Sequence, residues 1–147
     1  MKPLNLSERN PNPPLSLTPG LVHLWSLSVK DLGPFALPEI YGTILNGQEL
    51  QKFRGFAVDD AKLEFLAARL SIRTLLTMYF PQVERSSWQF EANQYGKPRV
   101  SNPQTGAPIE FNISHSGGEI ICALTQAAAL GIDIEKRKQQ TYGKRPQ

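Results

Sequence analysis

Residues 111 to 136 read FNISHSGGEIICALTQAAALGIDIEK, and this stretch decides the fold that the sequence predicts. Short apolar runs with polar residues at their ends predict three strands, at residues 109–114, 119–126 and 129–136. The connection between the last two is so short that it favours a hairpin. The stretch therefore predicts a small, mostly antiparallel sheet.

The last predicted strand carries two acidic residues, Asp133 and Glu135. Successive side chains of a strand point to opposite faces, so these carboxylates share one face and lie about 7 Å apart along the strand. Carboxylates at this spacing can hold one hard cation. Gly131 lets a bulky ligand approach the backbone closely. The pattern alone favours a second interpretation, in which the acids only keep an edge strand soluble.

One long helix dominates the middle of the chain. It is predicted over residues 59–80, with Asp59 or Asp60 as its N-cap and Pro81 after its end. Spacings of three, four and seven residues predict a buried face, made of Ala61, Phe65, Ala68, Ile72, Leu75 and Tyr79.

Strands on both sides of the helix complete the predicted fold. Alternating residues predict strands at residues 21–29 and 88–92, and a short helix is expected after Asn46. The predicted class is α+β, with one long helix packed on a small, mostly antiparallel sheet.

A basic stripe lies on a second face of the long helix. Arg69 and Arg73 follow Lys62 by 7 and 11 residues, offsets close to whole turns of a helix. In isolation such a stripe is typical of a solvated helix face, which is the interpretation that the sequence favours.

Length and composition indicate one domain with two tails. At 147 residues and 40% apolar content, the chain can bury one core. Residues 1–20 hold five of the twelve prolines, which predicts a flexible arm with nothing to pack. Residues 137–147 are expected to form a disordered basic tail, which leaves residues 21–136 as the folded subdomain.

Charge and cysteine content exclude several classes of partner. Residues 136–147 contribute +5 to a net charge of +3, so the rest of the chain carries −2. A short basic tail is usually only solvated, which disfavours a nucleic-acid partner. No apolar run is long enough for a membrane span or a secretory signal. The single cysteine, Cys122, cannot form an internal disulfide, which fits a reducing cytoplasm.

Three motifs in order relate the chain to a known family. They are YGKP at residues 95–98, FNISHS at residues 111–116 and GIDIE at residues 131–135, preceded by the helix sequence FLAARLSIR at residues 65–73. Together they resemble the 4′-phosphopantetheinyl transferases of the larger, pseudo-dimeric kind, the type that activates surfactin synthetase. The resemblance covers roughly residues 20 to 136, about the N-terminal half of such an enzyme.

The resemblance implies an activity and a set of site residues. Enzymes of this family transfer 4′-phosphopantetheine from coenzyme A to a serine of an apo acyl or peptidyl carrier protein, with Mg²⁺. Asp133 and Glu135 match the catalytic carboxylates that hold the metal, and Lys97 matches a basic phosphate contact. Ser114 and His115 match the pair that grips the 3′-phosphate end of coenzyme A. Arg54 is a further expected contact for the same ligand.

Two departures from the family pattern qualify this expectation. Glu64 stands where the family usually has an arginine that helps to hold coenzyme A. An acid there is expected to repel the phosphates, unless Lys62, Arg69 or Arg54 compensates its charge. No Trp-x-x-Lys-Glu segment, which supplies the third metal ligand in the family, follows Glu135. We therefore expect weak or absent activity of the chain alone, as a truncated enzyme.

The alternative is a non-catalytic half-enzyme that binds coenzyme A or a complementary chain, or a mere remnant. An exposed half-interface would favour self-association.

Overall fold

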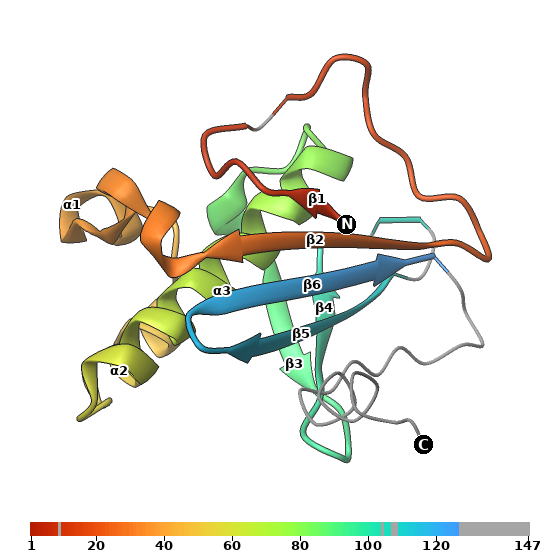
Figure 1. Cartoon of the computed structure of the whole chain (residues 1–147). Coiled ribbons are helices and arrows are strands. Elements are labelled where there is room, and N and C mark those ends of the chain that lie inside the picture. The colour runs from red at the N-terminus through yellow and green to blue at the C-terminus, as the bar shows by residue number, and fades with distance from the viewer. Residues whose placement is uncertain (9, 104, 107–108, 127–147) are drawn as a thin grey trace, which may run out of the picture.

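The computed structural model describes residues 1–126 except 9, 104 and 107–108 (Figure 1). The predicted strand at residues 129–136, its carboxylates Asp133 and Glu135, and the predicted basic tail lie outside the described residues.

A four-stranded sheet forms the centre of the fold, in the order β1-β2-β6-β5 (Figure 1). Its strands are β1 (Lys2–Pro3), β2 (Val22–Ser28), β5 (Glu110–Ser116) and β6 (Glu119–Thr125). β1 is parallel to β2, whereas β6 is antiparallel to both of its neighbours, β2 and β5. A second, antiparallel sheet consists of β3 (Gln89–Ala92) and β4 (Pro98–Asn102). The predicted α+β class with a mostly antiparallel sheet is therefore confirmed.

Both edges of β6 are paired along its whole length. β2 pairs with β6 from Val22 opposite Thr125 to Ser28 opposite Glu119, and β5 pairs over the same span of β6. The predicted hairpin between this strand and residues 129–136 involves a segment that lies outside the described residues.

A hairpin joins β5 to β6 through Gly117 and Gly118. Both glycines have positive φ, 59° and 84°, as a two-residue turn of type I′ requires. The glycine pair thus sets the register in which Ser116 faces Glu119.

The long helix α3 (Asp59–Tyr79) lies across one face of the four-stranded sheet (Figure 1). Its predicted extent was correct to within one residue, but Val58 is the N-cap, and Asp59 and Asp60 occupy the first helical turn. Negative charges in that turn interact favourably with the positive end of the helix dipole. Of the predicted buried face, Ala61 and Phe65 are half-buried, and the other four residues are buried: Ala68, Ile72, Leu75 and Tyr79.

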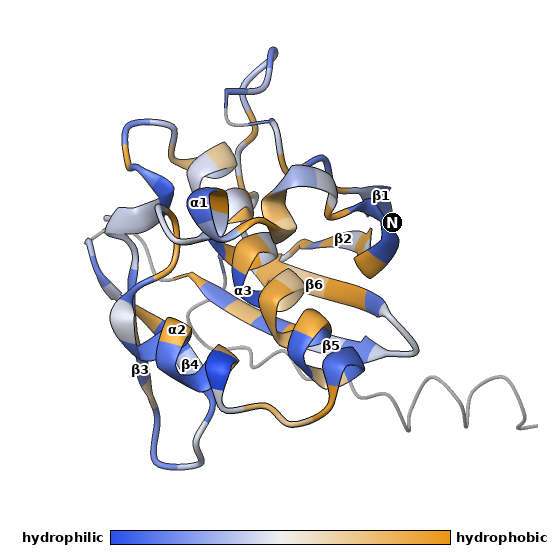
Figure 2. Ribbon diagram, turned by 90° about the vertical axis from the view of Figure 1, so that its left-hand side faces the viewer, coloured by the Kyte–Doolittle hydropathy of each residue, from blue (hydrophilic) through white to orange (hydrophobic). Residues whose placement is uncertain are grey.

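The core fills the space between α3 and the sheet. Alternation along the strands points every second side chain to the helix, and Figure 2 shows apolar residues concentrated on β6 and α3. The buried side chains on this face of the sheet are Trp25, Leu27, Phe111, Ile120, Cys122 and Leu124.

Short helices surround this core. They are α1 (Pro38–Tyr41), α2 (Gly47–Arg54) and the single-turn segments η1 (Val29–Asp31), η2 (Gly33–Ala36) and η3 (Arg85–Ser87). Asn46 and Glu49 form a capping box at the start of α2, with hydrogen bonds of 2.8 and 2.9 Å.

The N-terminal arm packs against the core, which corrects the prediction that residues 1–20 have nothing to pack. The Leu4 amide donates to the Ser26 carbonyl at 2.7 Å, which continues the pairing of β1 with β2. Leu4 and Leu6 are buried, and the Arg85 guanidinium donates to the Leu6 carbonyl at 2.7 Å. Proline content indicated only the lack of regular structure, and two isolated leucines were too weak a pattern to predict burial.

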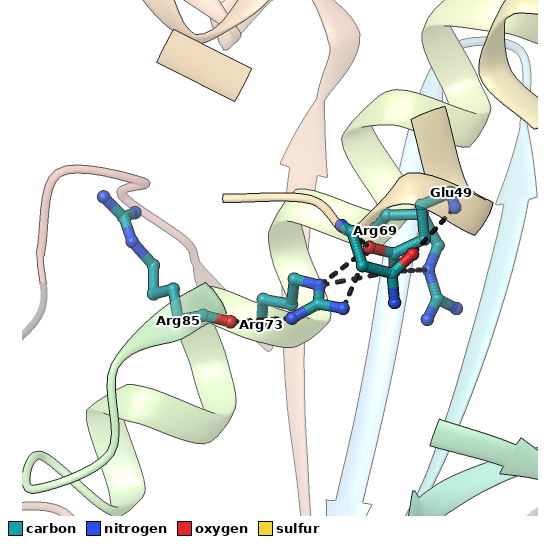
Figure 3. Close-up of polar contacts among 5 residues, drawn as sticks. Glu49, Arg69, Arg73 and Arg85 are labelled. Atoms are coloured by element: carbon teal, nitrogen blue, oxygen red, sulfur yellow. Dashed lines mark hydrogen bonds and ion pairs between the residues drawn. The ribbon is translucent and has the colours of Figure 1, made fainter. Parts of the chain in front are cut away.

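The basic stripe on α3 is buried at Arg73 and half-buried at Arg69 and Lys62, so the predicted solvated face is wrong. Arg73 is fully buried, and its Nη2 lies 2.9 Å from Oε1 of Glu49. The Nε of Arg69 donates to Oε2 of the same carboxylate at 2.8 Å (Figure 3). Both guanidinium groups also lie over the ring of Phe90, with Cζ 4.7 and 5.2 Å from its centroid. Lys62 is half-buried over the ring of Phe53.

Arg69 and Arg73 share one acidic partner, Glu49. Burial lowers the pKa of Arg73, and the charge of Glu49 opposes that shift. The Arg73 Nη1 donates to the Arg85 carbonyl at 2.8 Å, so Arg73 also joins α3 to η3 (Figure 3). Glu49 therefore ties α2 to α3 at a site where an unpaired charge would be costly.

Glu49→Ala should lower the free energy of unfolding by about 3–5 kcal/mol, the cost of leaving a buried charge without its partner. Urea denaturation of the variant and the wild type measures the difference. Glu91→Ala is the matched control, because Glu91 pairs with Arg99 while its side chain is 52% exposed. It should cost less than about 1 kcal/mol. Equal losses in the two variants would show that the cluster contributes no more than a surface ion pair.

Leu6→Ala should lower the free energy of unfolding by about 2–5 kcal/mol if the arm is part of the core. The Leu6 residue is 3% exposed, and Leu21, at 55% exposed, provides the control Leu21→Ala. The control should change the stability by no more than about 0.5 kcal/mol. A Leu6→Ala variant as stable as the control would mean that the arm is not packed in solution.

Candidate functional site

The predicted contacts for the ligand come from three parts of the structure. Ser114 and His115 lie on β5, Lys97 lies in the turn between β3 and β4, and Arg54 is the exposed last residue of α2. β4 contacts β5, which brings the sheet that carries Lys97 next to the strand of the serine–histidine pair.

The turn that carries Lys97 is built by Asn93. The Asn93 side chain accepts hydrogen bonds from the amides of Tyr95 and Lys97 at 2.8 and 2.9 Å. Gly96 has a φ of 82°, which lets the chain reverse within this short loop. The backbone of Lys97 is therefore held in place by the turn, and its side chain is half-buried.

Ser114 and His115 point to opposite faces of the sheet, because they are neighbours in a strand. Ser114 is buried on the face away from α3, whereas His115 is on the same face as Phe111 and Ile113. Among the described residues β5 is the last strand of its sheet, so its outer edge is the place where one ligand could contact both residues.

His115 is held by an acid from α3. Its Nδ1 lies 2.9 Å from Oε1 of Glu64, and the Gly118 amide donates to Oε2 of the same carboxylate at 2.6 Å. Both oxygens of Glu64 therefore have a partner within the fold. The residues are 51 and 54 positions apart, so no sequence pattern indicated the contact.

The other histidine has a structural role. His23 Nδ1 lies 2.6 Å from the Tyr79 hydroxyl, which also accepts from Trp25 Nε1 at 3.1 Å. Burial raises the pKa of Tyr79, and the hydrogen bond from Trp25 opposes that shift. This group joins β2 to α3 inside the core.

Within the described part of the chain, no group of three or more His, Cys, Asp or Glu side chains could hold a metal ion. Cys122 is fully buried in β6, and burial raises the pKa of its thiol to about 12. A thiol in this state is a core residue and not a nucleophile. No helix among the described residues has the length and apolar character that crossing a membrane requires.

Two holo-(acyl-carrier-protein) synthases are solved structures with a fold similar to that of this chain. The holo-(acyl-carrier-protein) synthase of Bacillus anthracis, solved in complex with CoA (3′,5′-ADP), has a TM-score of 0.56 at 17% identity. The match covers 70% of this chain and 91% of that one. The coenzyme A complex of the Helicobacter pylori holo-[acyl-carrier-protein] synthase has a TM-score of 0.51 at 10% identity and covers 71% and 98% of the two chains. At these identities the similarity shows the fold.

Sequence comparison identifies the family. The 4′-phosphopantetheinyl transferase HetI of Nostoc sp. is 31% identical over 126 residues, which cover 85% of this chain and 52% of that protein. The 4′-phosphopantetheinyl transferase Sfp of Bacillus subtilis is 30% identical over 100 residues, 68% of this chain and 42% of that protein. No family model matches the chain. The chain belongs to the 4′-phosphopantetheinyl transferase superfamily, and it spans about half the length of the curated relatives that it matches.

Cys122 should resist alkylation in the folded protein. A shift of the thiol pKa from 9.0 to about 12 leaves the thiolate about a thousandfold rarer at pH 8. The rate at which Cys122 reacts with iodoacetamide at pH 8 should therefore be at least about a hundredfold lower in the folded protein than in urea. The rate in the folded protein should rise as the pH approaches 12. Cys122 is the single cysteine, so mass spectrometry reports on it alone. Equal rates with and without urea would contradict its burial.

Proposed function

We propose that this protein acts in the transfer of 4′-phosphopantetheine from coenzyme A to a serine of an apo acyl or peptidyl carrier protein. The observation that carries the proposal is the 31% identity with a 4′-phosphopantetheinyl transferase over 85% of the chain. The same fold in two synthases solved with coenzyme A or its nucleotide portion supports it.

The chain's own residues would bind and orient coenzyme A. Lys97 is the proposed contact of the diphosphate, and the 3′-phosphate is assigned to Ser114 and His115 at the edge of β5. Arg54 is a further cationic contact at the end of α2. Fixed donors aimed at phosphate oxygens hold the reacting phosphorus in place and stabilise charge that develops there.

Asp133 and Glu135 are the proposed ligands of Mg²⁺ and the catalytic carboxylates. The chemistry of this donor set suits the ion, because Mg²⁺ in phosphoryl-transfer sites is bound by one or two carboxylates together with substrate phosphates. When bound, the ion would neutralise charge on the diphosphate. The hydroxyl that attacks phosphorus belongs to the carrier protein.

A cytoplasmic location is part of the proposal, because an unpaired, buried Cys122 suits a reducing compartment. Self-association of the chain is proposed as well.

The relatives are about twice as long as the matched segment. For that reason ligand binding and group transfer are separate questions, and binding of coenzyme A without transfer is the second candidate function.

The test is to incubate the purified chain with coenzyme A, Mg²⁺ and an apo carrier protein. Mass spectrometry should show a carrier heavier by one phosphopantetheine, and calorimetry should show that coenzyme A binds. Binding with an unchanged carrier mass would support the second candidate function. The absence of both would overturn the proposal.

Lys97→Ala should weaken coenzyme A binding about three- to tenfold, the usual effect of losing one phosphate contact at a half-exposed site. Lys30→Ala is the control, because Lys30 is an exposed lysine of the same charge in η1. Calorimetry should give an unchanged Kd for the control. Identical affinities in both variants would remove Lys97 from the site.

A further inference from the structure

Glu64 connects three separate segments of the structure. It belongs to α3, and its carboxylate accepts from His115 on β5 at 2.9 Å and from the Gly118 amide in the β5–β6 turn at 2.6 Å. The Glu64 side chain is only 15% exposed, whereas the His115 side chain is 55% exposed. The acid is thus enclosed, while much of the imidazole faces solvent.

This geometry determines the orientation of the imidazole. A carboxylate only accepts hydrogen bonds, so Nδ1 of His115 carries a proton when it contacts Glu64. With Nδ1 engaged, Nε2 lies on the opposite side of the ring, and no second hydrogen bond of His115 occurs among the described residues. The second nitrogen is available to a ligand at the outer edge of β5.

The charges also balance. When both nitrogens donate, the ring is an imidazolium, and the adjacent carboxylate compensates its charge. The second oxygen of Glu64 is occupied by the backbone amide of Gly118, where the positive φ of 84° favours glycine. A phosphate that reaches Nε2 therefore meets a charged donor, with the acid on the far side of the ring.

We propose that Glu64 is a positioning residue that holds His115 and the β5–β6 turn in the geometry in which His115 donates to a phosphate monoester of the ligand. This inference rests on the proposed function, which assigns the 3′-phosphate of coenzyme A to His115. It goes further, because it gives a role to an acid that the family resemblance predicted to repel the ligand.

The experiment measures how the chain distinguishes coenzyme A from 3′-dephospho-coenzyme A. Calorimetry of the full chain gives both Kd values for wild type, Glu64→Ala and Glu64→Gln. Asp60→Asn is the matched control, because Asp60 is an exposed acid one turn earlier on α3. Thermal unfolding of each variant shows whether it is folded. Glu64→Gln keeps the shape of the Glu64 side chain, so it still tests the inference if Glu64→Ala does not fold.

Glu64→Ala should weaken coenzyme A binding about tenfold, the loss expected for one charge-assisted hydrogen bond. Binding of 3′-dephospho-coenzyme A should change less than about twofold, since that ligand lacks the group that His115 contacts. The Kd of Glu64→Gln for coenzyme A should lie between those of wild type and Glu64→Ala, and the Kd of the control Asp60→Asn should match that of wild type. In a His115→Ala background the alanine at position 64 should add no further loss, because Glu64 acts through the histidine.

A purely structural role for Glu64 predicts a different result. Binding of the two ligands would then weaken equally, and the loss of affinity would persist in the His115→Ala background. Either result would overturn the inference, as would tighter coenzyme A binding by Glu64→Ala, which is the behaviour of a repelling acid.

Imidazole nitrogen NMR separates this inference from the proposed function. In wild type, Nδ1 of His115 should show a retained proton, which Glu64→Ala should release to the average of both tautomers. A wild-type chain that binds neither ligand would overturn the proposed function together with the phosphate assigned to His115. Unchanged nitrogen shifts in Glu64→Ala would overturn the positioning role even if coenzyme A binds.

Discussion

The packing of α3 against the sheet is the constraint on which the rest of the structure depends. A helix of 21 residues buries most of its C-terminal two-thirds against β2, β6 and β5, which gives a chain of this size a continuous core. The N-terminal arm, the short helices and the second sheet all pack around this unit. Because the helix is rigid, it also sets the places from which polar side chains can reach the sheet.

Two acids position α3 relative to its surroundings, one in the core and one near the surface. Glu49 comes from α2 and neutralises two arginines of α3, one of them fully buried. Glu64 belongs to α3 itself and contacts the β5–β6 hairpin through His115 and Gly118. The first arrangement stabilises the fold, because a buried charge needs a partner. The second one bears on function, because its histidine remains accessible.

The β5–β6 hairpin links the fold to the proposed activity. Its glycine turn sets the register of the strands, and strand alternation then places Ser114 and His115 on opposite faces. A ligand of both residues must therefore lie along the edge of β5.

Sequence alone determined the features that depend on local pattern. Helical spacing identified α3 and most of its buried face, alternation identified β2, β5 and β6, and three ordered motifs identified the family. Local pattern failed where a partner is distant in the chain. It placed the buried Arg73 and the half-buried Arg69 on a solvated face, because Glu49 is 20 residues or more away. It also missed the burial of Leu4 and Leu6 and the contact between Glu64 and His115. Those features were decided by the tertiary structure, since the energy of a charged or apolar side chain depends on the groups that folding brings into contact with it.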